Sequence, residues 1–336
     1  MQKRKEGDKM SDILKVSHSP HIGCKDTVTS IMLDVIIALM PALIAGCFVF
    51  GLRALVVTMV CVLSCLISEY IWNKLLKKPD TGGDLSAVVT GMILAFNLPA
   101  SIPYWVGIIG SVFAIIVVKQ FFGGLGHNFM NPALCARAFL LASWPLLMTT
   151  WYPADTVLPI FGQIDAVTSA TPLAAYASGN GNEYSYLTLL LGNYGGCIGE
   201  TSSIAILIGA VYLIVKKVIR IRVPLIFILT VALGMWLFSG NEGIGSGDVI
   251  YQVLSGGLLL GACFMATDYT TSPTTPLGQI IFALGCGIIT VLIRTWGGYP
   301  EGVTYAILLM NIATPLIDKI TPPRHFGYVR KKKGAA

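Results

Sequence analysis

The chain contains 336 residues, of which 54% are hydrophobic and 12% are charged, whereas an ordinary soluble domain has roughly 25% charged residues. Its mean hydropathy is +0.73. This composition is typical of an integral membrane protein and excludes a large soluble catalytic domain. The formal net charge of +6 comes from short basic clusters beside apolar runs, and such clusters indicate membrane topology rather than a nucleic-acid-binding surface. The eight cysteines form no C-x-x-C pair, so we predict neither a metal site nor a disulfide framework.

Ten apolar stretches predict membrane helices along the chain. A helix rises about 1.5 Å per residue, so about 20 apolar residues cross a hydrocarbon core. The first apolar run starts near Ile31, after a charged and mixed segment, which predicts that no cleavable signal peptide is present. The predicted helices are 31–50, 54–72, 85–97, 104–121, 131–149, 201–217, 222–239, 250–267, 278–296 and 303–318.

The Lys and Arg residues between these stretches indicate their orientation, because basic residues concentrate on the cytoplasmic side of a membrane. With the N-terminus inside, the inner connections contain nearly all of them, including Lys119. The outer connections hold only Arg53 and, near a helix end, Arg294. The longest connection, about 151–200, has no Lys or Arg. We therefore expect this loop on the outer face of a bacterial inner membrane, with both termini in the cytoplasm.

The two halves of the chain show weak internal similarity, because a constant shift aligns Gly83 with Gly257 and several later residues in the same way. Five spans in each half would give the halves opposite orientations, as in the inverted repeats of many transport proteins. The short apolar segments 85–97 and 256–267 precede Pro-containing polar stretches, which predicts half-helices that end inside the membrane. The sequence thus predicts an all-α polytopic membrane protein with about ten transmembrane helices in two inverted five-helix repeats with broken central helices. The predicted parts are a cytoplasmic segment (1–30), a first membrane repeat (31–150), an outer loop (151–200), a second membrane repeat (201–318) and a basic cytoplasmic tail (319–336).

The outer loop contains a cluster of hydroxyl side chains at 165–171, Asp-Ala-Val-Thr-Ser-Ala-Thr. One interpretation is a turn that caps a helix beginning near Pro172, with Thr171 as the N-cap. A second, compatible interpretation is a covalent flavin site. The segment resembles the motif Asp-x-x-(Ser/Thr)-Gly-Ala-Thr, at which a separate flavin transferase joins FMN through its phosphate to the last Thr. The residues that fit this motif are Asp165, Thr168, Ala170 and Thr171, and Ser169 replaces the usual Gly.

Five further parts of the chain are similar to one family of membrane proteins. They are 19–22, 84–91, 123–126 with 131–133, 266–269 with 272–273, and 299–302. On these segments the chain resembles the family that contains the RnfD subunits of the Rnf ferredoxin:NAD oxidoreductases and, less closely, the homologous NqrB subunits of the sodium-pumping NADH:quinone oxidoreductases. The resemblance covers about residues 17–320, and the short N-terminal segment favours the Rnf member.

The resemblance implies an electron-carrying membrane subunit of a multi-subunit redox pump, one that is not catalytic alone. In such a pump, electrons pass between ferredoxin and NAD through several subunits and drive Na⁺ or H⁺ across the membrane. The resemblance also implies FMN on Thr171, other Rnf subunits as partners and a flavin transferase for maturation. A protein of another class fits the same helix pattern, namely a solute channel or transporter of the urea-transporter type, which needs no flavin. The NqrB subunit of the quinone reductase is a further alternative.

A Gly-rich stretch at 123–132, Gly-Gly-Leu-Gly-His-Asn-Phe-Met-Asn-Pro, joins the fourth and fifth predicted helices. The glycines alone are consistent with a tight turn or with close helix packing. The resemblance implies a second, non-covalent flavin beside this loop, which is riboflavin in the relatives. The residues that could contact it are Gly124, His127, Asn128 and Asn131.

Ionisable residues within apolar stretches are costly at membrane depth and are therefore functional candidates. Four acids are candidates for an ion path, although each lies near a helix end and could instead reach the interface or cap a helix. They are Asp34, Glu69, Asp268 and Glu301. Arg137 lies within the fifth predicted helix and needs a carboxylate or backbone partner, or a flavin carbonyl or phosphate.

Overall fold

The computed structural model describes most of the chain. Within that part nearly all regular structure is helical, and β-structure is limited to one antiparallel bridge between Pro99 and Cys197. The predicted N-terminal segment, the C-terminal tail and Asp165 lie outside the described residues. The described residues are 27–77, 82–154, 156, 159–160, 168–178, 184–240, 245–298 and 301–322.

Each of the ten predicted apolar stretches forms helix. In the first half these are α2 (Val28–Phe50), α3 (Leu52–Leu75), α4 (Ser86–Phe96), α5 (Tyr104–Val112) continued by the π-helical η2 (Phe113–Gln120), and α6 (Pro132–Ser143) followed by α7 (Pro145–Thr149). In the second half they are α10 (Ser203–Val215), α11 (Arg222–Phe238), α12 (Val249–Leu254) followed by α13 (Leu258–Leu260) and the π-helical η3 (Gly261–Met265), α14 (Pro276–Trp296) and α15 (Val303–Ile320). The short elements are η1 (Gly82–Asp84), α8 (Pro172–Ala177), which confirms the helix expected to begin near Pro172, and α9 (Tyr186–Leu191).

Two stretches predicted as continuous helices are broken, and the expectation of one helix in each is therefore wrong. The 131–149 helix is interrupted at Trp144, because Pro145 has no N–H to donate and its ring disfavours helical backbone in the residue before it. The 250–267 helix is interrupted between α12 and α13. There Gly256 has a φ of +70°, a left-handed conformation that glycine adopts without strain.

The apolar character of the helices identifies a membrane protein. Four of them, α2, α3, α14 and α15, are each long and apolar enough to cross a membrane. Large apolar side chains on α2 and α3, such as Leu33, Ile44 and Ile67, are exposed. An apolar surface of this kind is stable in contact with lipid rather than with water.

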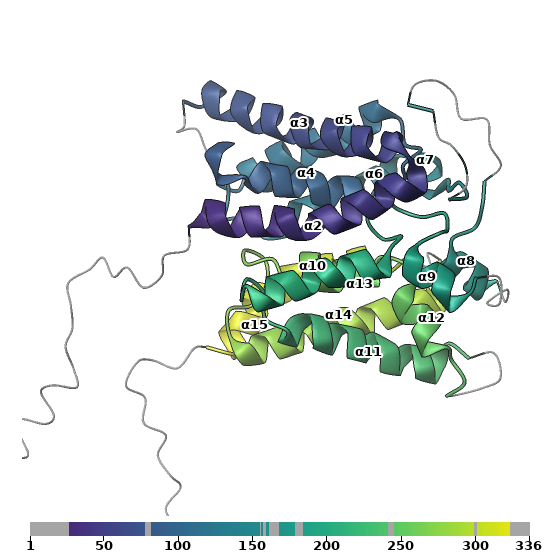
Figure 1. Ribbon diagram of the computed structural model, residues 1–336. Coiled ribbons are helices and arrows are strands. Elements are labelled where there is room, and N and C mark those ends of the chain that lie inside the picture. The colour runs from purple at the N-terminus through teal and green to yellow at the C-terminus, as the bar shows by residue number, and fades with distance from the viewer. Residues whose placement is uncertain are drawn as a thin grey trace, which may run out of the picture.

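The helices form two groups that meet along α2 and α10, with α2 to α7 on one side and α10 to α15 on the other (Figure 1). At the boundary, Gly209 of α10 lies so close to the carbonyl oxygen of Ala38 that a Cβ would overlap it. The longer elements run back and forth between two ends of the molecule. We call them the Thr171 end, which carries α7, α8 and α9, and the Asp268 end, which carries η1 and the loops 121–131 and 268–275.

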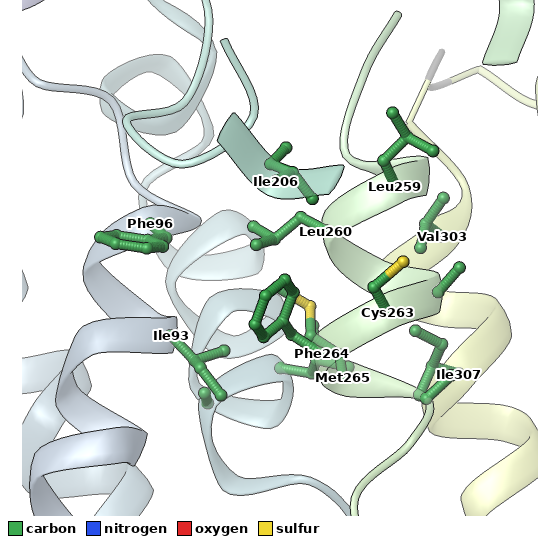
Figure 2. Close-up of a cluster of buried hydrophobic side chains, with 14 of the residues drawn as sticks. Ile93, Phe96, Ile206, Leu259, Leu260, Cys263, Phe264, Met265, Val303 and Ile307 are labelled. Atoms are coloured by element: carbon green, nitrogen blue, oxygen red, sulfur yellow. The ribbon is translucent and has the colours of Figure 1, made fainter. Parts of the chain in front are cut away.

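A buried apolar cluster separates the two ends at the centre of the molecule. Figure 2 shows side chains from α4, α10, α13, η3 and α15 that point toward one another there. We call its central part, which none of the members exposes by more than 6%, the apolar layer. Its members are Ile93, Phe96, Leu260, Phe264 and Met265.

Candidate functional site

A cavity of about 280 Å³ lies beside Thr171, between α6, α8 and the start of α15. This volume is near the lower end of the roughly 300–1,000 Å³ range of small-molecule sites. Apolar side chains, including Leu141, Met148 and Trp151, form part of its wall, and Arg137 and Glu301 form its charged part. A mainly apolar wall with few polar groups is suited to a planar aromatic ligand.

The predicted attachment residues lie at this cavity. Thr171 is the N-cap of α8, and its Oγ1 accepts a hydrogen bond of 3.2 Å from the Ala174 N–H, so the capping interpretation is confirmed. Its side chain also lines the cavity, as do Ser169 and Ala170. The buried Ser169 Oγ has no hydrogen-bond partner among the described residues, and such an atom is expected to bind a ligand or water. Thr168 is exposed and does not line the cavity.

Arg137 connects the cavity wall to four other parts of the chain. Its Nη1 donates to Asn97 Oδ1 at 2.8 Å and to Thr304 Oγ1 at 3.1 Å. Its Nη2 forms an ion pair with Glu301 and contacts the Cys197 Sγ at 3.6 Å. Arg137 therefore has the carboxylate partner that its buried position requires, and that partner is the predicted acid Glu301.

A second buried carboxylate lies behind this ion pair. Glu200 belongs to the loop 192–202, outside the apolar helices, and one of its oxygens accepts a 3.0 Å hydrogen bond from the Cys197 N–H. One oxygen of Glu200, one of Glu301 and the Cys197 Sγ all lie within 4.8 Å of one another. Burial and then the neighbouring Glu301 raise the pKa of Glu200 to about 8, and Arg137 opposes this shift. We assign no metal to these ligand atoms, because Arg137 already supplies positive charge to Cys197 and Glu301.

A second cavity, of about 90 Å³, lies at the Asp268 end. Asn128 and Asn131 line it, as predicted for the Gly-rich loop, but Gly124 does not and His127 is exposed. The Asn131 side chain accepts hydrogen bonds from the first N–H groups of α6, so it is an N-cap. The buried Asn128 Oδ1 has no partner among the described residues, which leaves it available to a ligand. Gly124 serves the turn, since its φ is +91°.

Asp268 lines the same cavity. It follows η3 and begins a tight turn, in which its carboxylate accepts hydrogen bonds of 3.0 Å from the Thr270 hydroxyl and 3.3 Å from the Thr271 hydroxyl. Asp34 lies elsewhere, on α2, where it accepts a 2.8 Å hydrogen bond from the Tyr212 hydroxyl of α10. Asp34 therefore joins the two helix groups near the Asp268 end.

Glu69 is paired with a base that the sequence did not identify as a buried residue. Lys119 and Gln120 of η2 both donate to Glu69 Oε1 at 2.9 Å, and Lys119 also donates to Ser86 Oγ at 2.6 Å. Both members of the ion pair are 2% exposed. Lys119 was expected in an inner connection, so its burial corrects the view that Arg137 is the one basic residue within the apolar part. π-Helical turns such as η2 are frequent at functional sites.

The sequence pattern gave no indication of Asn97, Cys197 and Glu200 as parts of the Thr171-end site. Asn97 ends α4, and Cys197 and Glu200 belong to a Gly-rich loop. Only the bridge between Pro99 and Cys197 brings these segments together. The one sequence signal was Glu200, an acid directly before an apolar helix.

Comparisons with known proteins agree on one family. The profile described as the NQR2, RnfD, RnfE family matches residues 15–327. The RnfD subunit of the Na⁺-translocating ferredoxin:NAD⁺ oxidoreductase complex of Acetobacterium woodii is 54% identical over 96% of this chain and 98% of that protein. The corresponding subunit of the proton-translocating ferredoxin:NAD⁺ oxidoreductase complex of Clostridium ljungdahlii is 46% identical over 94% of this chain and 97% of that protein. The corresponding subunit of the ion-translocating oxidoreductase complex of Halorhodospira halophila is 37% identical over 93% and 95%, respectively.

Proposed function

Because the chain belongs to the NQR2, RnfD, RnfE family, we propose that it is the RnfD subunit of an Rnf complex, an electron-transfer subunit of an ion-translocating ferredoxin:NAD⁺ oxidoreductase. The names of its relatives support this assignment over the NqrB subunit of a quinone reductase. One relative is named for Na⁺ and another for protons, so the proposal includes either ion. The other Rnf subunits are the proposed partners.

The proposed membrane arrangement has ten crossings in two inverted repeats, with the Thr171 end outside a bacterial inner membrane and both termini in the cytoplasm. The matching order of elements in the two helix groups supports the repeats. In the first group α3 packs against α4 and α5, and in the second α11 packs against η3 and α14. The lack of Lys and Arg in 151–200 supports the orientation.

The proposed cofactor of the Thr171 end is FMN, joined through its phosphate to Thr171 by a flavin transferase. The observation that carries this proposal is the cavity beside Thr171, together with the unpartnered Ser169 hydroxyl in its wall. FMN would supply single-electron exchange, and the protein would supply position and electrostatics. Leu141, Met148 and Trp151 would exclude water from the ring system, and Arg137 would face it with positive charge.

Thr171→Ala is expected to remove all covalent flavin, because the ester oxygen is lost. The measurement is ultraviolet-excited fluorescence of the denatured polypeptide band, from cells that also contain the flavin transferase. Thr168→Ala is the matched control and should keep its fluorescence, because Thr168 is exposed and lies outside the cavity wall. Fluorescence that persists in Thr171→Ala contradicts the attachment site, and a wild-type band without fluorescence favours the solute-transporter alternative.

A second, non-covalent flavin, riboflavin, is proposed at the Asp268-end cavity. The unpartnered Asn128 Oδ1 supports it, because this atom can accept a hydrogen bond from a ring N–H. The cavity has Asp268 in its wall and Lys119 beside Ser86. The proposed ion path uses the acids identified in the sequence, Asp34, Glu69, Asp268 and Glu301.

Asp268→Asn is expected to leave the complex assembled while ion uptake falls severalfold. The amide keeps an oxygen for the Thr270 and Thr271 hydroxyls but removes the charge. The measurements are membrane abundance, ferredoxin-driven NAD⁺ reduction and ion uptake by the assembled complex. Asp84→Asn is the control, because Asp84 caps the turn before α4 and lines neither cavity. Normal uptake in Asp268→Asn removes Asp268 from the path, and low abundance with unchanged specific activity assigns it a structural role.

A further inference from the structure

Two buried carboxylates share one direct cationic partner behind the Thr171 cavity. The guanidinium of Arg137 forms an ion pair with Glu301, and no such pair is found for Glu200 among the described residues. Glu200 is 3% exposed, and one of its oxygens lies within 4.8 Å of a Glu301 oxygen. Two negative charges at that separation in a buried site repel each other strongly, so one of the two carboxyls retains a proton.

The surroundings identify Glu200 as the carboxyl that retains the proton. Glu301 has Arg137 directly against it and is 19% exposed, so its ionised form is favoured. Glu200 faces the backbone of Gly257, where a Cβ would lie 3.3 Å from its Oε2. The raised pKa of Glu200 has the same direction.

The other ionisable groups around Glu200 do not replace this proton. Tyr194 and Cys197, on its own loop, are neutral, and burial raises the pKa of both. Arg294 of α14 adds a more distant positive charge, but its guanidinium is bonded to α12, where Nη1 donates to the Gln252 carbonyl at 2.7 Å. Arg294 also lines a separate polar cavity of about 200 Å³.

We propose that Glu200 is a neutral carboxylic acid at neutral pH and that its proton keeps the wall of the Thr171 cavity free of net negative charge. Arg137 and Glu301 then balance each other, and the cavity favours a group that gains negative charge on reduction. At alkaline pH the Glu200 proton passes to water, and the carboxylate left behind opposes reduction. The effect on the flavin rests on the proposed attachment of FMN to Thr171, whereas the protonation state of Glu200 does not.

The first measurement is the midpoint potential of the covalent flavin in the assembled complex as a function of pH. In the wild type it should be constant near neutral pH and fall as the pH rises through about 8. Glu200→Gln, which is neutral at every pH and keeps an oxygen for the Cys197 N–H, should match the wild type at neutral pH and lose the alkaline fall. Glu301→Gln should move the fall to lower pH, because Arg137 can then stabilise the Glu200 carboxylate. Asp84→Asn, at the opposite end, should follow the wild type.

Two results would overturn the proposal. One is a Glu200→Gln potential well above that of the wild type at neutral pH, because Glu200 would then be ionised in the wild type. The other is an alkaline fall that persists unchanged in Glu200→Gln.

A second measurement needs neither a flavin nor a variant that assembles. The infrared difference spectrum of the wild-type protein between neutral and alkaline pH should show the loss of a protonated buried carboxyl, and its absence contradicts the proposal. Where Glu200→Gln assembles, this signal should be missing from its spectrum. A wild-type protein without covalent flavin would refute the proposed function, and the infrared result would still decide the state of Glu200.

Discussion

Arg137→Ala is expected to remove most of the folded protein from the membrane. The substitution leaves Glu301 without its ion pair and removes the donors to Asn97 and Thr304. Breaking a buried ion pair by removing one partner typically costs about 3–5 kcal/mol, because the remaining charge is buried and uncompensated. That is a large part of the roughly 5–15 kcal/mol that stabilises a typical domain. The measurement is the amount of monodisperse protein extracted in mild detergent, together with its apparent melting temperature.

The double variant Arg137→Ala with Glu301→Gln is the control for this interpretation. It removes the orphaned charge while leaving the same gap in the packing. We expect it to recover a large part of the lost protein and melting temperature. If Arg137→Ala is as abundant and heat-stable as the wild type, then the ion pair does not hold α6 and the start of α15 together.

Gly209→Ala is expected to weaken the packing of the two helix groups against each other. The new Cβ would overlap the carbonyl oxygen of Ala38 in α2 and lie 3.0 Å from Phe264 Cζ. A backbone oxygen within a helix cannot move aside alone, so α2 and α10 must separate. Overpacking of this kind typically costs about 1–3 kcal/mol, and more where backbone must shift. The expected result is a clear fall in the apparent melting temperature of the detergent-extracted protein.

Gly285→Ala is the matched control, because it makes the same change inside another helix. There the Cβ would meet the flexible end of the Met310 side chain, which can rotate away. Its melting temperature should stay near that of the wild type. Equal losses in the two variants would mean that the Gly209 contact with α2 has no special role.

The sequence predicted the helices well, because membrane helices depend on local apolar runs. Capping is also local, which is why Thr171 and Pro172 were identified correctly as a helix start. The two helix breaks depend on single residues, Pro145 and Gly256, and were overlooked within otherwise apolar stretches. The presence of α9 was not foreseen, because six residues carry too little periodic signal.

The ion pairs could not be predicted, because their members are distant in sequence and meet only through the fold. Arg137 and Glu301 are 164 positions apart, and no local pattern links them. Lys119 had the sequence context of a topology signal, and only the π-helical turn of η2 against α3 makes it a buried partner of Glu69. Glu200 illustrates the same limit, since its neighbours come from three separate parts of the chain.

The apolar layer between the two cavities has an electrical consequence. A thickness of Ile93, Phe96, Leu260, Phe264 and Met265 side chains polarises weakly, so much of a transmembrane voltage falls across it rather than across the polar cavities (Figure 2). Moving one elementary charge through 100 mV corresponds to about 2.3 kcal/mol. In the proposed function, an electron that passes between groups in the two cavities therefore does work with or against the membrane voltage. The rate and equilibrium of that step should respond to voltage, even if no ion moves through this chain.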